Sequence, residues 1–204
     1  APVIPFHPVS FPANTLRQST EPLPLRAVFT RLHSADDIPD CANVCQMIYI
    51  PINTKEHIVK ELQNRGLPLA VTMPRGMFGT ERTIASKLEQ FLKWDISHVW
   101  AGTVNSVALA KTIGCNIHGG YSLNVTNTAA FEWYEQLGLT DLELSYELTL
   151  KQSAKIGGNL PRGLLLYGRL PLMLCRNCPG KNDGKNCKNC NGTTWLTDRK
   201  NIKF

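Results

Sequence analysis

The amino-acid sequence predicts an α/β fold in which alternating βα units form a whole or partial TIM-like (β/α) barrel. Short apolar runs alternate with amphipathic runs about six times, at a spacing of roughly 25 residues, as successive βα units do. Each apolar run is nearly continuous, which is typical of parallel strands buried on both faces. An open doubly wound sheet is the alternative, but neither a glycine-rich dinucleotide fingerprint nor a Walker loop supports it.

Composition divides the chain into three segments. Residues 1–24 hold six of the thirteen prolines, and because proline fixes φ and lacks a backbone donor, we expect an extended linker there. Residues 25–174 carry the alternating pattern and are expected to form the barrel-like domain. Residues 175–204 carry four clustered cysteines and are expected to form a metal-binding segment.

The expected strands and helices follow one another along the barrel-like domain. Apolar runs predict strands over residues 25–32, 45–52, 67–75, 97–102, 115–124, 141–148 and 163–174. Amphipathic or glycine-terminated runs predict helices over residues 54–66, 80–95, 104–114, 126–138 and 149–157. Ser34 indicates a further helix start, because a serine side chain can cap a helix and acidic residues follow it.

Charge and hydropathy indicate which partners and which cellular location to expect. The net charge of +6 permits contact with RNA or another polyanion without requiring it. No apolar run approaches the ~18 residues of a membrane span, and no secretory signal opens the chain, so we expect a cytoplasmic protein without a membrane partner. The chain starts without methionine at Ala1, and both ends resemble cuts in a longer protein. We therefore expect a missing N-terminal part of the same protein as a partner.

Four cysteines are the strongest local signal in the sequence. Cys175, Cys178, Cys187 and Cys190 form two C-x-x-C pairs separated by a short loop rich in glycine and asparagine. Such pairs can bring four thiolates to one ion, so the spacing predicts Zn²⁺, with an iron–sulfur cluster as the alternative. Disulfides are disfavoured because nothing marks the chain as secreted. Lysines and arginines surround this loop and could contact RNA or form a solvated face.

A second set of candidates comes from position. In (β/α) barrels the chemistry lies where strands end, and the predicted strand ends and following loops carry polar side chains. These pocket candidates are Arg75, Asn105, His118, Asn124, Glu147, Tyr167 and Arg169. His118 lies between Ile117 and Gly119 and could also be a core histidine. No G-x-S-x-G elbow and no H-E-x-x-H helix is present, so the pattern names no catalytic residue.

Several stretches resemble the U32 peptidase family, also called collagenase-like proteases. The resemblance is carried by residues 117–152, which include IHGGYSLN and ELTLKQ, by residues 164–179 and by LTDRKNIKF at residues 196–204. It is closest to the C-terminal part of long family members. The resemblance implies a barrel-like α/β fold and a nominal peptidase activity.

The resemblance also implies a second kind of chemistry. Some relatives are linked to oxygen insertion into RNA bases or quinone precursors and carry iron–sulfur clusters on cysteines. Cys178, Cys187 and Cys190 lie where the family pattern tends to place cysteines. Cys175 departs from that pattern, where a small polar residue is expected, and Asn201 stands where glycine is expected.

Three hypotheses for the function follow. The first is the C-terminal region of a U32 peptidase, a nominal hydrolase that we expect to be inactive as an isolated fragment. The second is an accessory or RNA-binding region of an enzyme that hydroxylates tRNA or rRNA. The third is a structural portion of a barrel that a metal ion staples.

Overall fold

The computed structural model describes residues 24–168, 170, 174, 197 and 199–202. The chain splits into two compact units, residues 1–168 and 169–204, and the first contains all of the helices and strands below. Within it, seven parallel strands pair in the order in which they occur along the chain. These strands are β1 (Arg26–Val28), β2 (Met47–Pro51), β3 (Leu69–Thr72), β4 (His98–Ala101), β5 (Asn116–Gly119), β6 (Asp141–Glu143) and β7 (Arg162–Gly163).

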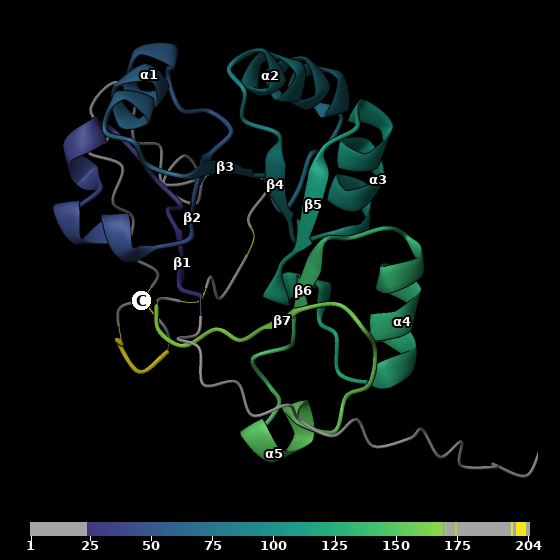
Figure 1. The fold of residues 1–204 in the computed structure, drawn as a ribbon. Coiled ribbons are helices and arrows are strands. Elements are labelled where there is room, and N and C mark those ends of the chain that lie inside the picture. Colours follow the sequence, from purple (N-terminus) through teal and green to yellow (C-terminus); the bar gives the residue numbers. More distant parts are fainter. Residues whose placement is uncertain (1–23, 169, 171–173, 175–196, 198, 203–204) are drawn as a thin grey trace, which may run out of the picture. The chain divides into compact units, whose positions relative to one another are not determined.

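Helical segments connect these strands. The α-helices are α1 (Glu56–Asn64), α2 (Glu81–Lys93), α3 (Val104–Ile113), α4 (Thr128–Gln136) and α5 (Leu150–Ser153). Three 3-10 helices are η1 (Ala35–Asp37), η2 (Asp40–Val44) and η3 (Tyr121–Leu123). Figure 1 shows α1 to α4 following one another around the outside of the sheet.

The strand order decides between the two expected architectures. A doubly wound sheet reverses its strand order at a switch point, whereas strands β1 to β7 run consecutively without reversal. The sheet is also curled, because Arg26 Nη2 in β1 lies 2.8 Å from Asp141 Oδ2 in β6. Five strand spacings of about 4.8 Å would separate these strands by roughly 24 Å in a flat sheet. The expectation of a partial βα barrel is therefore confirmed.

The two faces of the curled sheet bury different side chains. Alternate strand residues such as Ile48, Val71 and Leu142 belong to the large apolar core that also holds buried residues of α1 to α4. The intervening residues belong to the inner face, where Tyr49 and Trp100 form part of a smaller cluster. We call the space enclosed by this inner face the lumen. The polar and ionisable strand residues described below lie on this side.

Several predicted elements differ in bounds or type from those of the structure. The strand expected over residues 141–148 ends at Glu143. The chain leaves the sheet there, because the Ser145 N–H donates to the carbonyl oxygen of Val125 and not to a neighbouring strand. The strand expected over residues 163–174 is described only at Arg162–Gly163, and residues 164–168 contain no strand. Ser34 does precede a helical turn with a capping box, but that turn is the short 3-10 helix η1.

The structure leaves the expectations for the two terminal segments largely untested. The extended linker expected over residues 1–24 lies outside the described part of the chain except for residue 24, and the metal-binding segment expected over residues 175–204 lies outside it except for residues 197 and 199–202. Within the part that is described, no helix combines the length and apolar character needed to cross a bilayer.

Candidate functional site

Ionisable side chains gather in the lumen in two groups. The first group, which we call the amino layer, consists of Arg26, Tyr49, His98, His118 and Asp141. Most of them come from the beginning of a strand, and parallel register places His118 directly beside Asp141. The second group, which we call the carboxyl layer, consists of Trp100, Tyr121 and Glu143, and its members lie nearer the carboxyl ends of β4, β5 and β6.

The amino layer is a closely bonded network. Asp141 Oδ2 lies 2.6 Å from His118 Nδ1 and 2.8 Å from Arg26 Nη2. His118 Nε2 lies 2.8 Å from His98 Nδ1, and Arg26 Nη1 lies 3.4 Å from the Tyr49 hydroxyl. His118 and Asp141 are almost fully buried. Because β1, β4, β5 and β6 each contribute a member, the network links strands across the lumen.

Charge pairing dominates the electrostatics of the amino layer. Burial would raise the pKa of Asp141, but hydrogen bonds from His118 and Arg26 outweigh it and hold that pKa below its ordinary value. Burial would lower the pKa of Arg26, but its hydrogen bonds and charge interactions with Asp141 and Tyr49 together outweigh burial and raise that pKa. The carboxylate and the guanidinium therefore stay charged as a pair. Burial, together with the neighbouring His118, lowers the pKa of His98.

The carboxyl layer is bonded less completely. The backbone N–H of Tyr121 donates to Glu143 Oε2 at 2.9 Å. The indole Nε1 of Trp100 is buried and has no hydrogen-bond partner of normal geometry among the described residues. Its N–H nevertheless lies near enough to Glu143 to stabilise the ionised carboxylate, which lowers the pKa of Glu143 by less than burial raises it. Burial is the largest influence on Glu143 and raises its pKa. A carboxyl with a raised pKa and an indole N–H without a hydrogen-bond partner of normal geometry among the described residues therefore lie side by side.

Aromatic rings line the same end of the lumen. The rings of Trp100 and Tyr121 have centroids 5.5 Å apart, and those of Tyr121 and Tyr146 have centroids 5.7 Å apart. Tyr146 is half exposed. A Cβ atom on Gly120 would lie 2.0 Å from the indole of Trp100, so the indole lies directly against the glycine backbone. Gly120 thus sets the position of Trp100 beside Glu143.

The structure scatters the pocket candidates that were named from predicted strand ends. His118 alone joins the amino layer, fully buried. Arg75 is exposed after β3, and its charge is close enough to lower the pKa of Tyr121, which burial raises. The other described candidates are exposed: Asn105, Asn124, Glu147 and Tyr167. Ser145 Oγ donates to Asn124 Oδ1 and accepts from the backbone N–H of Glu147. Arg169 lies outside the described residues.

Sequence analysis missed Arg26, His98, Asp141 and Glu143. A signal for three of them exists in the strands themselves, since His98, Asp141 and Glu143 each alternate with a buried apolar neighbour, as in DLE at residues 141–143. In a strand whose other face is apolar, a charged residue at alternate positions indicates a polar lumen. The carboxylate at the true end of β6 is Glu143, four residues before the candidate Glu147.

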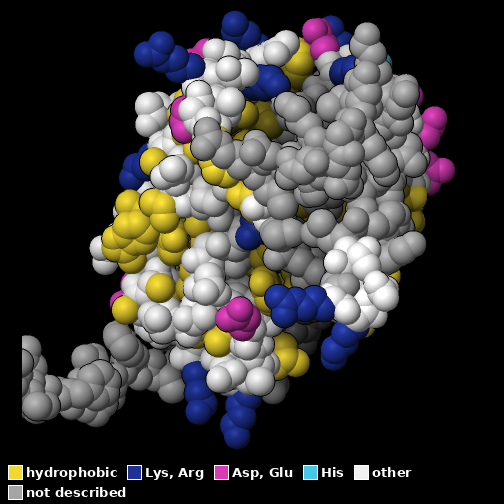
Figure 2. Space-filling view, turned by 180° about the vertical axis from the view of Figure 1, so that it is seen from behind, with side chains coloured by type: hydrophobic (Ala, Val, Ile, Leu, Met, Phe, Trp, Pro, Cys, Tyr) yellow, Lys and Arg dark blue, Asp and Glu magenta, His cyan; other side chains and the backbone are white. Residues whose placement is uncertain are grey.

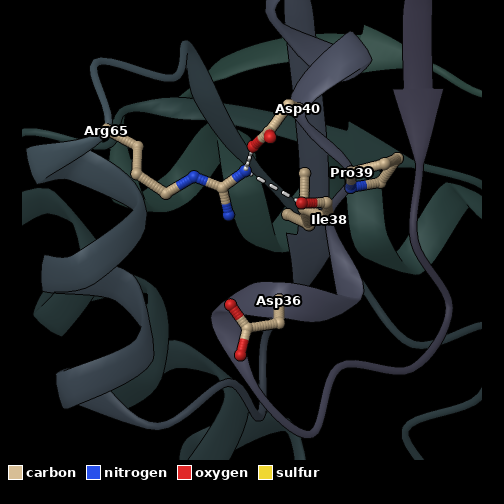
Figure 3. Close-up of a pocket in the computed structure, with 5 residues that line it drawn as sticks. All are labelled: Asp36, Ile38, Pro39, Asp40 and Arg65. Carbon is tan, nitrogen blue, oxygen red and sulfur yellow. Dashed lines mark hydrogen bonds and ion pairs between the residues drawn. The ribbon is translucent and has the colours of Figure 1, made fainter.

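A hollow on the outer surface provides a contrast to the lumen. Figure 3 shows Asp36, Ile38, Pro39 and Asp40 around Arg65, the residue that follows α1. The Arg65 guanidinium donates to the carbonyl oxygens of Ala35 and Ile38 at 2.8 and 2.9 Å and pairs with Asp40. These bonds tie α1 to η1 and η2. The hollow is therefore a structural joint between these elements.

The cysteines separate into two sets. Cys175, Cys178, Cys187 and Cys190 lie outside the described residues, so the metal site remains a prediction from their spacing. Among the described residues, no group of three or more histidine, cysteine, aspartate or glutamate side chains could hold a metal ion. The other three cysteines of the chain are free thiols, of which Cys41 is exposed and Cys45 and Cys115 are partly buried.

Comparison with known proteins supports the fold. No family model and no curated protein matches the chain. A solved structure described as that of the U32 peptidase Mk0906 matches with a TM-score of 0.54 at 14% sequence identity. The match covers 74% of this chain and 72% of that protein. At this identity the likeness shows a shared fold, and it agrees with the architecture of consecutive parallel strands.

Proposed function

We propose that the chain is a U32-family, collagenase-like protein whose carboxyl layer is an acid–base site for hydrolysis of peptide bonds. Fold likeness to a U32 peptidase supports the family, as does the sequence resemblance over residues 117–152, a stretch that includes Tyr121 and Glu143 of the carboxyl layer. The observation that carries the site is Glu143, a half-buried residue whose carboxyl has its pKa raised by desolvation, near the carboxyl end of a barrel strand. Active sites of barrels of this kind lie at that end.

The chemistry available to Glu143 is general acid–base catalysis. A carboxyl whose pKa lies above its ordinary value can hold a proton for a leaving amine and can accept one from an attacking water. The buried N–H of Trp100, which has no partner among the described residues, can donate to an oxygen that gains negative charge. Tyr121 and Tyr146 offer flat apolar faces beside these groups. Together these side chains fit a planar group that carries a carbonyl oxygen.

A covalent route finds no support in the described residues. Both ring nitrogens of His118 are engaged, one by Asp141 and the other by His98. Ser122 Oγ donates to the carbonyl oxygen of Gly102, and Ser145 Oγ donates to Asn124. Because no described serine or cysteine is hydrogen-bonded to a histidine, water activated by Glu143 is the nucleophile that we propose.

The cysteine segment and the RNA-binding alternative remain proposals from sequence. We propose that Cys175, Cys178, Cys187 and Cys190 hold one Zn²⁺ or one iron–sulfur cluster, because four thiolates suit either. On the face drawn in Figure 2, lysine and arginine side chains are spread around the coloured surface and interspersed with acidic ones. That part of the surface gives no support for a continuous RNA-binding patch.

Cleavage of short peptides tests the acid–base site. The wild-type chain, Glu143→Gln and Glu147→Gln are incubated with a mixed library of short peptides, and the products are identified by mass spectrometry. Glu147 is the matched control, because it is a carboxylate of the same segment that is exposed to solvent. We expect Glu143→Gln to lower the cleavage rate by about 100-fold or more, which is typical of losing a general acid–base group, and Glu147→Gln to preserve it.

The same assay separates the hypotheses made from the sequence. Equal loss in both variants would remove Glu143 from the chemistry. If the wild-type chain cleaves no peptide, the hydrolase proposal fails for this chain. The expectation of an inactive fragment, or of a structural barrel portion, would then describe it better.

A further inference from the structure

Three side chains of the amino layer form a line of hydrogen bonds that the proposed hydrolytic site does not use. The carboxylate of Asp141 lies 2.6 Å from His118 Nδ1, and His118 Nε2 lies 2.8 Å from His98 Nδ1. Both separations are those of strong hydrogen bonds. No described residue hydrogen-bonds His98 Nε2, and the His98 side chain is half-buried, whereas His118 and Asp141 are almost completely enclosed. The line thus runs from a buried acid to a more accessible ring nitrogen.

The chemistry of the donors fixes where the protons lie when both rings are neutral. An ionised carboxylate only accepts hydrogen bonds, so Nδ1 of His118 carries a proton and donates to Asp141. His118 Nε2 is then an acceptor, and Nδ1 of His98 must carry the proton between the two rings. This arrangement leaves Nε2 of His98 with a free lone pair. It also places both histidines in the Nδ1–H tautomer.

We propose that Asp141, His118 and His98 form a proton relay, and that Nε2 of His98 is a second acid–base site, for a ligand that presents an O–H or N–H group. In the forward step, the ligand proton moves to Nε2 of His98, and the ligand keeps the electron pair. The Nδ1 proton of His98 passes to Nε2 of His118. The resulting imidazolium of His118 is held by Asp141, which stays ionised. The reverse transfers return the proton.

The surrounding charges suit this role. Arg26 from β1 pairs with Asp141 from β6, so the carboxylate stays ionised and keeps His118 oriented without depending on a charged histidine. Tyr49 from β2 contributes a neutral phenol, because burial raises its pKa far above neutrality, and its ring packs edge-on against His118. Burial and His118 keep the pKa of His98 low, so the ring is neutral and able to accept a proton near pH 7.

A purely structural ion pair would not need His98. Arg26 and Asp141 already neutralise each other across the lumen. His98 adds a second imidazole in line with the first, and its outer nitrogen finds no partner in the described part of the chain. An aspartate that orients a histidine and stabilises its imidazolium form is a recurrent means of making the outer nitrogen a better base.

The tautomers of the wild-type chain test the relay directly. Long-range ¹H–¹⁵N spectra at neutral pH distinguish a protonated from an unprotonated ring nitrogen at each of the five histidines. We expect Nδ1–H for both His98 and His118, with the His118 Nδ1 proton shifted downfield by its short bond to Asp141. An Nε2–H tautomer at His98, or a doubly protonated His118 at neutral pH, would overturn the proposal, because Nε2 of His98 would then have no lone pair to offer.

A variant pair shows whether Asp141 sets these tautomers. In Asp141→Asn the amide can donate to Nδ1 of His118, which moves the proton to Nε2 of His118 and then shifts His98 to its Nε2–H form. Glu143→Gln alters the other layer and is expected to leave both tautomers unchanged. An unchanged His98 tautomer in a folded Asp141→Asn chain would contradict the relay. If this variant does not fold, the wild-type spectra still decide the question.

Reactivity provides an independent readout. Diethylpyrocarbonate acylates neutral imidazole nitrogens, and peptide mapping locates the modified histidine. We expect His98 to react faster in the wild type than in His118→Gln, because His118 can no longer accept the Nδ1 proton as Nε2 is acylated. Equal rates at His98 would overturn the relay. Neither readout involves peptide cleavage, so a failed relay and a failed hydrolytic site are distinguishable.

Discussion

The two layers of the lumen differ in how completely their polar groups are paired. In the amino layer, the Asp141 carboxylate meets both a guanidinium and an imidazole, and hydrogen bonds outweigh the cost of its burial. In the carboxyl layer, Glu143 accepts one backbone hydrogen bond, and burial dominates. Two carboxyls that are two residues apart on one strand therefore have pKa values displaced in opposite directions. Their neighbours, rather than their depth in the protein, determine the direction.

This difference suggests a division of labour. A paired network ties the first strand of the sheet to the sixth and maintains the curl of the half-barrel. An incompletely paired acid, together with a buried indole N–H that lacks a described partner, is suited to interact with a ligand. The Arg26–Asp141 pair of the amino layer is thus expected to matter most for stability, and the carboxyl layer for the proposed peptide hydrolysis. Substitutions in each layer test this difference.

The largest expected effect on stability comes from removing the charge of Asp141. Asp141→Asn leaves the Arg26 guanidinium without its carboxylate inside the protein. Breaking one partner of a buried pair typically costs about 3–5 kcal/mol in the free energy of unfolding. Glu143→Gln is the matched isosteric change, and we expect it to cost less than about 1 kcal/mol because it removes a charge that burial disfavours. Urea denaturation of both variants measures the difference, and equal costs would contradict the division of labour.

A smaller effect is expected from Gly120→Ala. The backbone of Gly120 has φ of −85°, which any residue can adopt, so a cost must come from the added methyl group. That methyl group would meet the indole of Trp100 at 2.0 Å. We expect about 1–3 kcal/mol of destabilisation, as for other overpacked sites, and a shift of the indole away from Glu143.

A second background isolates the contact between Gly120 and Trp100. In Trp100→Leu, the same Gly120→Ala change should cost less, because the indole is absent. A cost that does not depend on residue 100 would show that the methyl group acts elsewhere.

Features that depend on neighbouring residues in the sequence could be predicted, whereas features that depend on contacts between distant residues could not. Local hydrophobic runs indicate the alternation of strands and helices, so the barrel-like fold could be predicted from the sequence. The end of β6 could not, because ELSYEL continues the apolar pattern while Ser145 bonds to Val125 in the loop after β5. That shift of the strand end directed attention to Glu147 and away from Glu143.

The amino layer depends on contacts between residues that are far apart in the sequence. Arg26 and Asp141 come from the first and sixth strands, and no local pattern reveals that the sheet curls enough to join them. His118 could be named from its position near a strand end. Its partners became identifiable only once the register between β5 and β6 was known.

The pH dependence of stability should show opposite slopes for the two carboxyls. The Asp141 pKa is lower in the folded chain than the ordinary value of about 3.9, so the stability it contributes is present above that value and is lost as pH falls towards the folded pKa. The Glu143 pKa is raised. As pH rises above about 4.3, the unfolded chain ionises first, and stability falls until the folded pKa is passed.

Denaturation across this pH range separates the two contributions. In Glu143→Gln the fall in stability above about pH 4.3 should become smaller, while the loss at lower pH should remain. Persistence of the full fall in this variant would mean that another group causes it.

The smallest expected effect on the lumen comes from metal removal. If Cys175, Cys178, Cys187 and Cys190 hold a metal, a chelator should release one zinc ion or the iron of one cluster per chain, which elemental analysis and the visible absorption spectrum distinguish. Because the barrel unit has its own large apolar core, we expect its thermal unfolding midpoint to change little. A large drop in that midpoint would show that the two units depend on each other.

The opposite displacement of the two carboxyl pKa values can be measured site by site. Carboxyl ¹³C signals of the wild-type chain are followed from acid to neutral pH, with Asp141 and Glu143 assigned from the Asp141→Asn and Glu143→Gln variants. We expect Asp141 to titrate below about 3.9 and Glu143 above about 4.3, their ordinary values. Ordinary values for both groups, or a Glu143 that ionises before Asp141, would contradict the account of the two layers.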